Sequence, residues 1–332
     1  GGCTSAPASR TVEFTNCPAM ACGTNLLSNG GFENYSACPV NAQDLTKAVG
    51  WIGSGSYYNT ICNGYYNSPS YYPYFNVGNY TMGLAGGGTF PPPSGAGYAG
   101  LILGGTFFKN FVTQQVNLSC SKEYTLQFRA TTPRSDTPPD NSLCVYGSNT
   151  APPYAGCDPN LTLLACLPSP ASIDNYWKPQ TLTFTPTVNY TYMVVTGQCP
   201  TATGHGGTVF LDDLFLCGTC VNPPANVSAV EVSPETCIGN DGDGTVTATS
   251  CGAPLTYSWA LTSNPGVPLS SVQSPTNLVA GNYTVTVTDS GNCSSSGSAV
   301  ITSISPLAAP TASVTVQPTC TTPTGTIVVT AP

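Results

Sequence analysis

Apolar and polar residues alternate along most of this chain with a period of two. Clear examples are the runs at residues 125–129, 181–185 and 283–288, each bounded by Gly, Pro, Asn or Ser. Alternation of this kind indicates β-strands that bury one face. A helical spacing is plausible in one short stretch, residues 43–49, about two turns long. The pattern therefore predicts an all-β fold built from β-sandwiches.

The composition shifts at two places, at residues 221–225 and again at residues 304–310, where prolines interrupt the strand pattern. Such shifts are typical of linkers between domains. They separate a large domain (24–220), a smaller domain (225–305) and the start of a second copy of the smaller domain (306–332), and a cysteine-rich N-terminal segment (1–23) precedes these three parts.

The evidence for a second copy is a repeated motif. Thr236-Cys237 followed by a strand at 244–249 reappears as Thr319-Cys320 followed by a strand at 325–330, and the two cysteines are offset by 83 positions. A period of this kind indicates tandem repeats. Two strands alone cannot bury a face, so either the chain continues or a neighbouring molecule supplies the missing strands. We favour continuation.

The smaller domain shows five expected strands, at residues 227–232, 245–250, 255–261, 283–289 and 299–304. This spacing is typical of an immunoglobulin-like sandwich. Its motifs at Cys237, 243–247, 257–259, 277–289 and 291–293 resemble the repeat of the giant gliding-motility adhesins of Bacteroidetes. The resemblance implies a spacer in a cell-surface filament.

One cysteine departs from that repeat. Cys251 stands where the repeat usually has Gly. The loops after the second and sixth strands of a sandwich lie at the same end, so we expect a disulfide between Cys251 and Cys293.

An acidic turn, Asp241-Gly242-Asp243-Gly244, invites comparison with a calcium loop because alternating carboxylates hold hard cations. An EF-hand needs further oxygen ligands and a Glu near position 12 of the loop. Gly-Asp-Gly is ordinary turn chemistry, so we interpret these residues as a turn.

The large domain opens with residues 25–33 and closes with residues 208–216. These segments resemble the first and last strands of jelly-roll carbohydrate-binding modules, and the residues between them resemble the jelly-roll domains that head many secreted Bacteroidetes surface proteins. The insertion at residues 133–175 does not fit that pattern. Because it carries Cys144, Cys157 and Cys166, we expect it to be a disulfide-pinned loop.

The jelly-roll resemblance also implies a structural calcium site. In such modules the first strand and the terminal Asp often hold Ca²⁺, which maps onto Gly31, Glu33 and Asp213 here. Carboxylates and backbone carbonyls on adjacent strands suit a hard cation. The alternative is that Glu33 and Asp212 simply face water.

Aromatic residues concentrate near the start of the large domain, in a stretch with a single nearby cation, Lys47. Aromatic rings stack on sugar rings, but they also favour protein interfaces and core packing. Glycan contact, a subunit interface and plain packing all stay open. The candidate ligand-binding residues are Trp51, Tyr58, Tyr65, Tyr66, Tyr71, Tyr72 and Tyr74.

The amino-acid composition indicates the cellular compartment of the protein and the classes of partner it can bind. The 16 cysteines, with 35 Gly and 31 Pro, indicate an oxidising, extracellular compartment and a disulfide-rich fold. Charged residues make up only 7%, the net charge is −8, and no residue after Lys178 is basic. We therefore expect no nucleic-acid partner and no direct membrane insertion. Self-association, neighbouring surface proteins and glycans stay as candidate partners of a secreted or cell-surface protein.

Catalytic motifs are absent from the sequence. The chain has one histidine, His205, in a Gly-rich stretch with no nucleophile motif around any serine. We expect no enzyme activity and, calcium aside, no cofactor. Two hypotheses follow: a structural or adhesive segment of a cell-surface adhesin or fibre, or a carbohydrate-binding module of a larger secreted polysaccharide-degrading enzyme.

Overall fold

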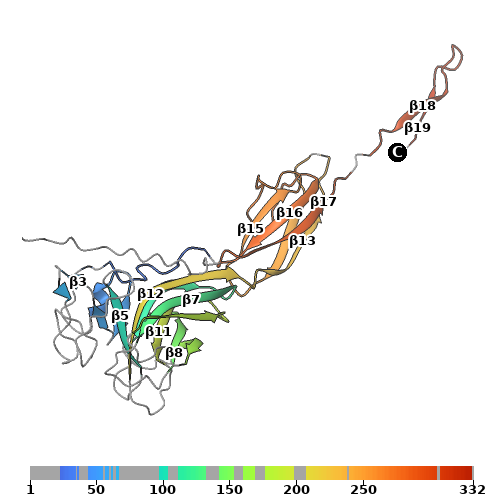
Figure 1. The fold of residues 1–332 in the computed structure, drawn as a ribbon. Helices are drawn as coiled ribbons and strands as arrows, with labels where there is room; N and C mark the ends of the chain where they lie inside the picture. Colours follow the sequence, from blue (N-terminus) through green and yellow to red (C-terminus); the bar gives the residue numbers. More distant parts are fainter. Residues whose placement is uncertain are drawn as a thin grey trace, which may run out of the picture. The chain divides into compact units, whose positions relative to one another are not determined.

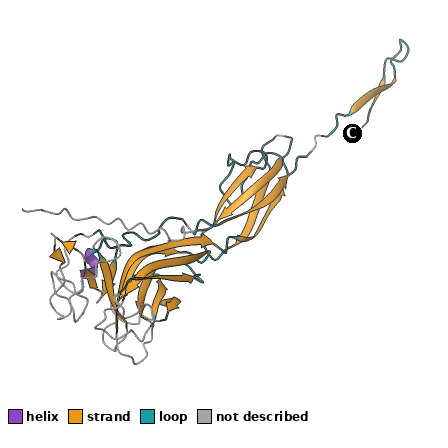
Figure 2. Ribbon diagram, viewed as in Figure 1, coloured by secondary structure: helices purple, strands orange, loops and turns teal. Residues whose placement is uncertain are grey.

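The structure is a computed structural model of the chain. It describes residues 23–34, 36, 44–54, 57–59, 61–62, 65–66, 97–103, 111–131, 142–152, 160–168, 176–197, 207–237, 239–304 and 307–330. The regular secondary structure of the described part consists of β-strands apart from one short 3-10 turn (Figure 2), which confirms the all-β prediction.

The helical element at the expected place is shorter than predicted. It is a 3-10 turn, η1 (Asp44–Lys47), instead of the two α-helical turns expected over 43–49. A hydrogen bond from Ala48 N to Leu45 O closes the turn, and Ala48 itself enters a β-bridge. Within the described residues, no helix is long and apolar enough to cross a membrane.

The chain divides into two compact units, residues 1–221 and 222–332. The division falls in the segment 221–225, where the sequence predicts a linker. Each unit has its own hydrophobic core.

The first unit contains two five-stranded sheets (Figure 1). The first sheet has the order β1 (Ile52–Ser54), β6 (Phe111–Leu118), β11 (Tyr190–Gly197), β8 (Leu143–Ser148) and β9 (Thr162–Leu167). The second has the order β10 (Lys178–Phe184), β7 (Lys122–Thr131), β12 (Gly207–Cys220), β5 (Tyr98–Leu103) and β2 (Tyr57–Asn59). A separate pair joins β3 (Ile61–Cys62) to β4 (Tyr65–Tyr66).

The core of the first unit follows from the period of two. Along β7, Tyr124, Leu126, Phe128 and Ala130 are buried, while the residues between them are partly exposed. The Tyr124 ring stacks on Phe184 of the neighbouring strand at 5.6 Å between ring centroids. Burial of these apolar faces is the main stabilising term.

The opening segment of the first unit lies against its closing strand, as the jelly-roll resemblance predicts. Leu26 N donates to Leu216 O at 2.7 Å, and Leu214 N donates to Gly30 O at 3.0 Å. Asn25 reinforces the contact because its Oδ1 accepts from Leu216 N at 2.8 Å. The segment is bound to β12 without forming a regular strand.

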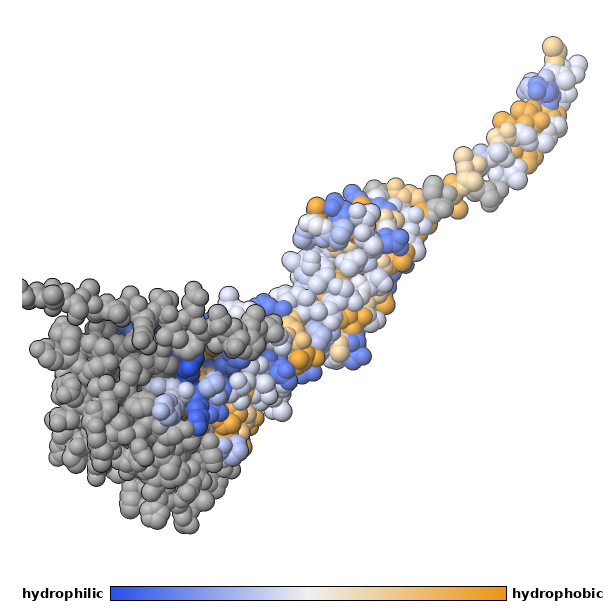
Figure 3. Space-filling view, in the orientation of Figure 1, coloured by the Kyte–Doolittle hydropathy of each residue, from blue (hydrophilic) through white to orange (hydrophobic). Residues whose placement is uncertain are grey.

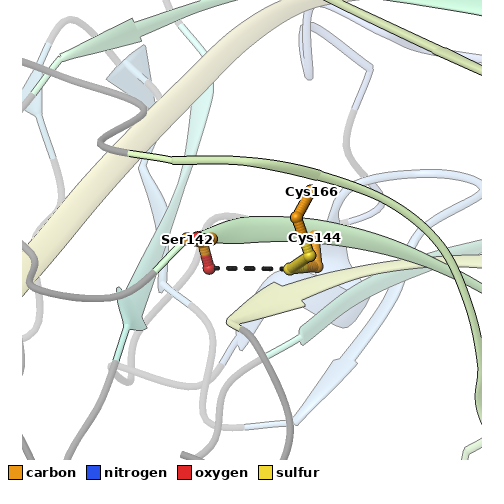
Figure 4. The surroundings of a disulfide bond; sticks show 3 residues. All are labelled: Ser142, Cys144 and Cys166. Atoms are coloured by element: carbon orange, nitrogen blue, oxygen red, sulfur yellow. Dashed lines mark hydrogen bonds between the residues drawn. A yellow bond between two sulfur atoms is a disulfide. The ribbon is translucent and has the colours of Figure 1, made fainter. Parts of the chain in front are cut away.

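The insertion 133–175 was expected to be a loop, and this prediction is wrong. It contains β8 and β9, which complete the first sheet. Every residue of β8 is buried, so the strand is covered on both faces. A strand of this kind lacks the alternation of apolar and polar residues that marks a half-buried strand in a sequence. The disulfide is confirmed: Cys144 and Cys166 lie directly opposite each other on these strands and are bonded (Figure 4).

The second unit contains a five-stranded sandwich. A two-stranded sheet of β13 (Ala225–Ser233) and β14 (Asp243–Thr249) accompanies a three-stranded sheet of β15 (Thr256–Leu261), β16 (Gly281–Thr288) and β17 (Ser294–Ile301). Trp259, Tyr283, Val285, Val287 and Val246 form its buried core. The five predicted strands are present, but β17 begins at Ser294 instead of Ala299.

A segment without regular secondary structure, residues 269–275, pairs with the edges of this sandwich. Trp259 O of β15 accepts from Leu269 N at 2.7 Å. Further along, the segment accepts from β14: Val246 N donates to Gln273 O and Gly244 N to Pro275 O, each at 3.1 Å. The segment therefore pairs with both sheets.

A final hairpin follows, formed by β18 (Thr311–Val316) and β19 (Thr326–Thr330). Its pairing register repeats that of β13 and β14 at a constant offset of 83 residues: Ala229 faces Val246, and Ala312 faces Val329. The register shift recurs at the same place, at Glu231/Ser233 and at Val314/Val316. The shared register agrees with the prediction that this hairpin opens a second repeat.

Candidate binding surfaces

Trp51, predicted as a ligand contact, belongs to the core. Its side chain is 3% exposed, and its ring lies 5.0 Å from the Phe32 ring. Its indole Nε1 donates to Asn29 O at 2.9 Å. Both the apolar face and the polar tip of the indole are therefore used inside the protein, and no ring face is offered to a sugar.

Three of the tyrosine candidates, Tyr58, Tyr65 and Tyr66, lie on short described strands. Tyr58 lies on β2, opposite Ala99 of β5, and β2 ends the order of its sheet among the described strands. Tyr65 and Tyr66 form β4, where Tyr65 faces Cys62. Tyr71, Tyr72 and Tyr74 lie outside the described residues. The glycan and interface alternatives for these tyrosines stay predictions.

The proposed calcium ligands Glu33 and Asp213 each have a protein partner. Glu33 Oε1 accepts from Gly97 N at 2.8 Å, next to the start of β5. Asp213 Oδ2 pairs with Arg129 Nε of β7 at 3.3 Å. These two partners belong to the strands on either side of β12, because the sheet order is β7-β12-β5.

The calcium site on Gly31, Glu33 and Asp213 stays a prediction. Gly31 adjoins Gly30, whose carbonyl already accepts from Leu214 N. Over the described ranges, no group of three or more His, Cys, Asp or Glu side chains is placed to hold a metal ion. Asp212, taken as the alternative exposed carboxylate, is fully buried, and its Oδ1 accepts from Asp213 N at 2.7 Å. The expectation that Asp212 faces water is therefore wrong.

The acidic turn of the second unit is held by its own side chains. Asp241 accepts from both the backbone N and the hydroxyl of Thr236. The hydrogen bonds from Thr236 lower the pKa of Asp241, because they stabilise the ionised carboxylate. Asp243 Oδ2 accepts from Ser233 Oγ at 2.9 Å. These contacts match the interpretation of this segment as a turn.

Cysteines of the second unit fall into two classes. Cys251 and Cys293 are both disulfide-bonded, and Ser290 N of one loop donates to Gly252 O of the other at 2.8 Å. Cys237 and Cys320 are free thiols, and both are exposed. The adjoining loops support the predicted pairing of Cys251 with Cys293, which stays a prediction.

The hairpin β18–β19 presents an apolar surface. Cross-strand pairs place Ala312, Val314, Ile327 and Val329 on one face. All residues of both strands are exposed, with Ile327 at 64% and Val329 at 62%. Apolar atoms are visible along the hairpin (Figure 3). The sequence reveals this surface through the repeat and not through any binding motif.

Comparison with known proteins gave structural similarities only. The K1 cleaved adhesin domain of Lys-gingipain from Porphyromonas gingivalis W83 has a TM-score of 0.32 at 14% identity, and the match covers 57% of this chain and 96% of that domain. The K3 cleaved adhesin domain of the same protein has a TM-score of 0.24 at 17% identity, over 41% of this chain and 81% of that domain.

A beta-1,2-glucanase from Parabacteroides distasonis has a TM-score of 0.26 at 11% identity, and the match covers 86% of this chain but 39% of the glucanase. Similarities of this size carry no argument about function. No family model matches the chain, and no curated protein matches it. The function of this chain is therefore argued from its own residues.

Proposed function

We propose that this chain is a non-enzymatic, extracellular segment of a cell-surface adhesin or fibre that mediates attachment or filament assembly. The observation that carries this proposal is the recurrence of one hairpin, with the same register and the same irregularity, 83 residues apart. Tandem sandwiches of this kind extend a protein in one direction. A jelly-roll unit followed by such repeats has the organisation of a projecting surface protein.

The carboxylates of the repeat support a structural role. Glu235 Oε1 accepts from Asn240 N at 2.7 Å, and its Oε2 accepts from Ala280 N at 2.8 Å. Asp289 Oδ1 accepts from Gly291 N and Cys293 N. Charge-assisted bonds to backbone N–H groups fix loop geometry. The acidic side chains of this unit therefore stabilise turns, as a spacer requires.

Immunogold electron microscopy of the source cells tests this proposal. Antibody raised against the full chain is expected to label filaments or a surface layer that projects from intact cells. Label found only in culture fluid, in fractions that degrade polysaccharide, would instead identify the chain as the binding module of a secreted enzyme. An antibody to an unrelated surface protein serves as the control.

Glycan binding by the first unit is the second candidate function. It is favoured by the position of Tyr58, Tyr65 and Tyr66 on short strands at the margin of the unit. A glycan array probed with the full chain is expected to show binding that Tyr65→Ala with Tyr66→Ala removes. Tyr176→Ala is a matched control, because this exposed tyrosine lies outside the aromatic stretch. Binding that persists in the double variant would exclude these side chains.

A further inference from the structure

The first repeat, residues 225–304, begins and ends on two strands that run in the same direction. β13 carries the chain into the sandwich, and β17 carries it out (Figure 1). Just beyond these strands, Glu235 and Ser303 form a parallel β-bridge. In it, Glu235 N donates to Thr302 O and Ile304 N donates to Glu235 O, each at 2.8 Å. The last residues of the repeat are therefore hydrogen-bonded to the chain that follows its first strand.

A carboxylate reinforces this contact. Glu231 of β13 accepts hydrogen bonds from both the backbone N and the hydroxyl of Thr302, the second at 3.1 Å between the two oxygens. Hydrogen bonds with one ionised partner are stronger than those between neutral groups. The exit of the repeat is therefore bound both to a side chain of its entry strand and to the backbone that follows that strand. We call the contact of Glu231 and Glu235 with residues 302–304 the terminal bridge.

Parallel strands at the entry and the exit of one domain are loaded in a particular way by tension. A Cβ added to Gly297 of β17 would lie 3.1 Å from Val227 O of β13, so the two strands lie close together near their starts as well as at the terminal bridge. Tension along the chain pulls the start of β13 and the end of β17 in opposite directions. Hydrogen bonds that join two parallel strands across their axes must then break together, because the strands slide past each other. An antiparallel hairpin pulled at its open end instead opens one bond at a time.

Neither glutamate of the terminal bridge recurs at the 83-residue offset. Glu231 corresponds to Val314, and Glu235 corresponds to Pro318. A valine side chain offers no acceptor, and proline has no backbone N–H to donate. This hydrogen-bonded contact is therefore a feature of the sandwich at residues 225–304 and does not follow from the repeat pattern.

We propose that the terminal bridge is a mechanical tie, which keeps the first repeat folded when tension acts along the chain. Attachment or filament assembly at a cell surface exposes a projecting protein to such tension, so the inference rests on the proposed function and adds resistance to force to it. The tie slows unfolding under force, because it must break before β13 and β17 separate. Forced unfolding is governed by the rate of unfolding and not by the equilibrium free energy.

Single-molecule force measurements on the full chain test this proposal. Handles are attached at Pro223→Cys and Leu307→Cys, two exposed positions that flank the first repeat. The exposed thiols of Cys237 and Cys320 are replaced by serine so that they do not react with the handles. Force then acts between the start of β13 and the end of β17, and the unfolding rate at constant force is read from the extension step.

Two substitutions break the terminal bridge at different atoms. Glu231→Ala removes both bonds to Thr302 and is expected to raise the unfolding rate under force at least about tenfold. Ile304→Pro is expected to raise it as well, because it removes the N–H that donates to Glu235 O. Ile304→Ala is the matched control, since it keeps this N–H and shortens a side chain that is 52% exposed.

Val287→Ala separates resistance to force from ordinary stability. It removes buried methyl groups from β16, outside the terminal bridge, and so lowers the stability in denaturant, but it is expected to accelerate unfolding under force less than Glu231→Ala does. Equal acceleration by these two variants, or equal rates for Ile304→Pro and Ile304→Ala, would overturn the proposal. The Ile304 pair decides the outcome if Glu231→Ala does not fold. Failure of the tie leaves the immunogold labelling of the cell surface unaffected, so it is distinguishable from failure of the proposed function.

Discussion

The hydroxyl of Tyr283 donates a hydrogen bond to the backbone carbonyl of Val279, four residues earlier, at 2.9 Å. The ring is fully buried and meets Trp259 edge to face at 6.3 Å. An immunoglobulin-like sandwich commonly carries such a tyrosine corner, where the hydroxyl fixes the turn into a central strand. The contact locks the entry to β16.

Removal of this hydroxyl is expected to weaken the second unit. Tyr283→Phe leaves the Val279 carbonyl without its donor, so the free energy of unfolding should fall by about 1 kcal/mol. Tyr257→Phe on β15 is the control, since this tyrosine is only partly buried. Chemical denaturation of both variants measures the difference. Equal stability of Tyr283→Phe and the unmodified chain would show that the bond contributes nothing.

The raised pKa of Tyr283 predicts that the second unit loses stability at high pH. Burial raises the pKa of Tyr283 above its usual value, and the negative charge of Glu235 raises it further. Because the pKa of Tyr283 is higher in the folded than in the unfolded state, the contribution of Tyr283 to the free energy of unfolding is complete below the unfolded pKa of about 10. It is lost as the pH rises through the folded pKa. The stability gap between the unmodified chain and Tyr283→Phe should therefore narrow above about pH 10. Denaturation in the Cys237→Ser, Cys320→Ser background, which removes the two thiols found free among the described residues, checks this, and a constant gap would contradict it.

Much of the second unit was predictable because its strands alternate. The β16 run keeps apolar residues on one face and threonines on the other, and the structure buries Tyr283, Val285 and Val287 as this pattern requires. The start of β17 was missed because Ser294–Ser298 is rich in Ser and Gly, which favour loops. Pairing with β16 overrides that local preference.

The first unit was harder to predict for a physical reason. β8 is covered on both faces, so its sequence gives no periodicity and its Pro-rich surroundings suggest a loop. The many aromatic residues near Trp51 in the sequence favour a ligand surface. The composition of a segment, however, does not distinguish a buried ring from an exposed one. In contrast, the contact between the opening segment and β12 was predictable, because motifs at both ends of the domain marked it.

Gly30 leaves no room for a side chain, so a substitution at this position tests the contact between the opening segment and β12. A Cβ at this position would lie 1.9 Å from the Leu214 carbonyl oxygen, so the backbone contact with β12 would have to open. Gly30→Ala is expected to lower the free energy of unfolding by about 2 kcal/mol or more. Gly266→Ala is the control, since nothing lies within 4 Å of its added Cβ. Calorimetry measures both variants, and unchanged unfolding of Gly30→Ala would refute the contact.

The free and the disulfide-bonded cysteines of the second unit predict a specific pattern of alkylation. Iodoacetamide added to the native chain should modify the exposed thiols of Cys237 and Cys320 and leave Cys251 and Cys293 unmodified. A digest without reduction should then contain one cross-linked peptide pair joining Cys251 to Cys293. Mass spectrometry identifies both products. A peptide that links either cysteine to residues 1–221 would disprove the predicted pairing.

Calcium binding by the first unit can be decided by thermal unfolding with and without the ion. A ligand that binds the folded state at 100 times its Kd adds about 2.7 kcal/mol to stability, which is a shift of several degrees. Glu33 and Asp213 are already engaged by Gly97 N and Arg129 on opposite sides of β12, so we expect millimolar Ca²⁺ and EGTA to give the same unfolding temperature. A rise in Ca²⁺ that Glu33→Gln abolishes would establish the site that the jelly-roll resemblance implies.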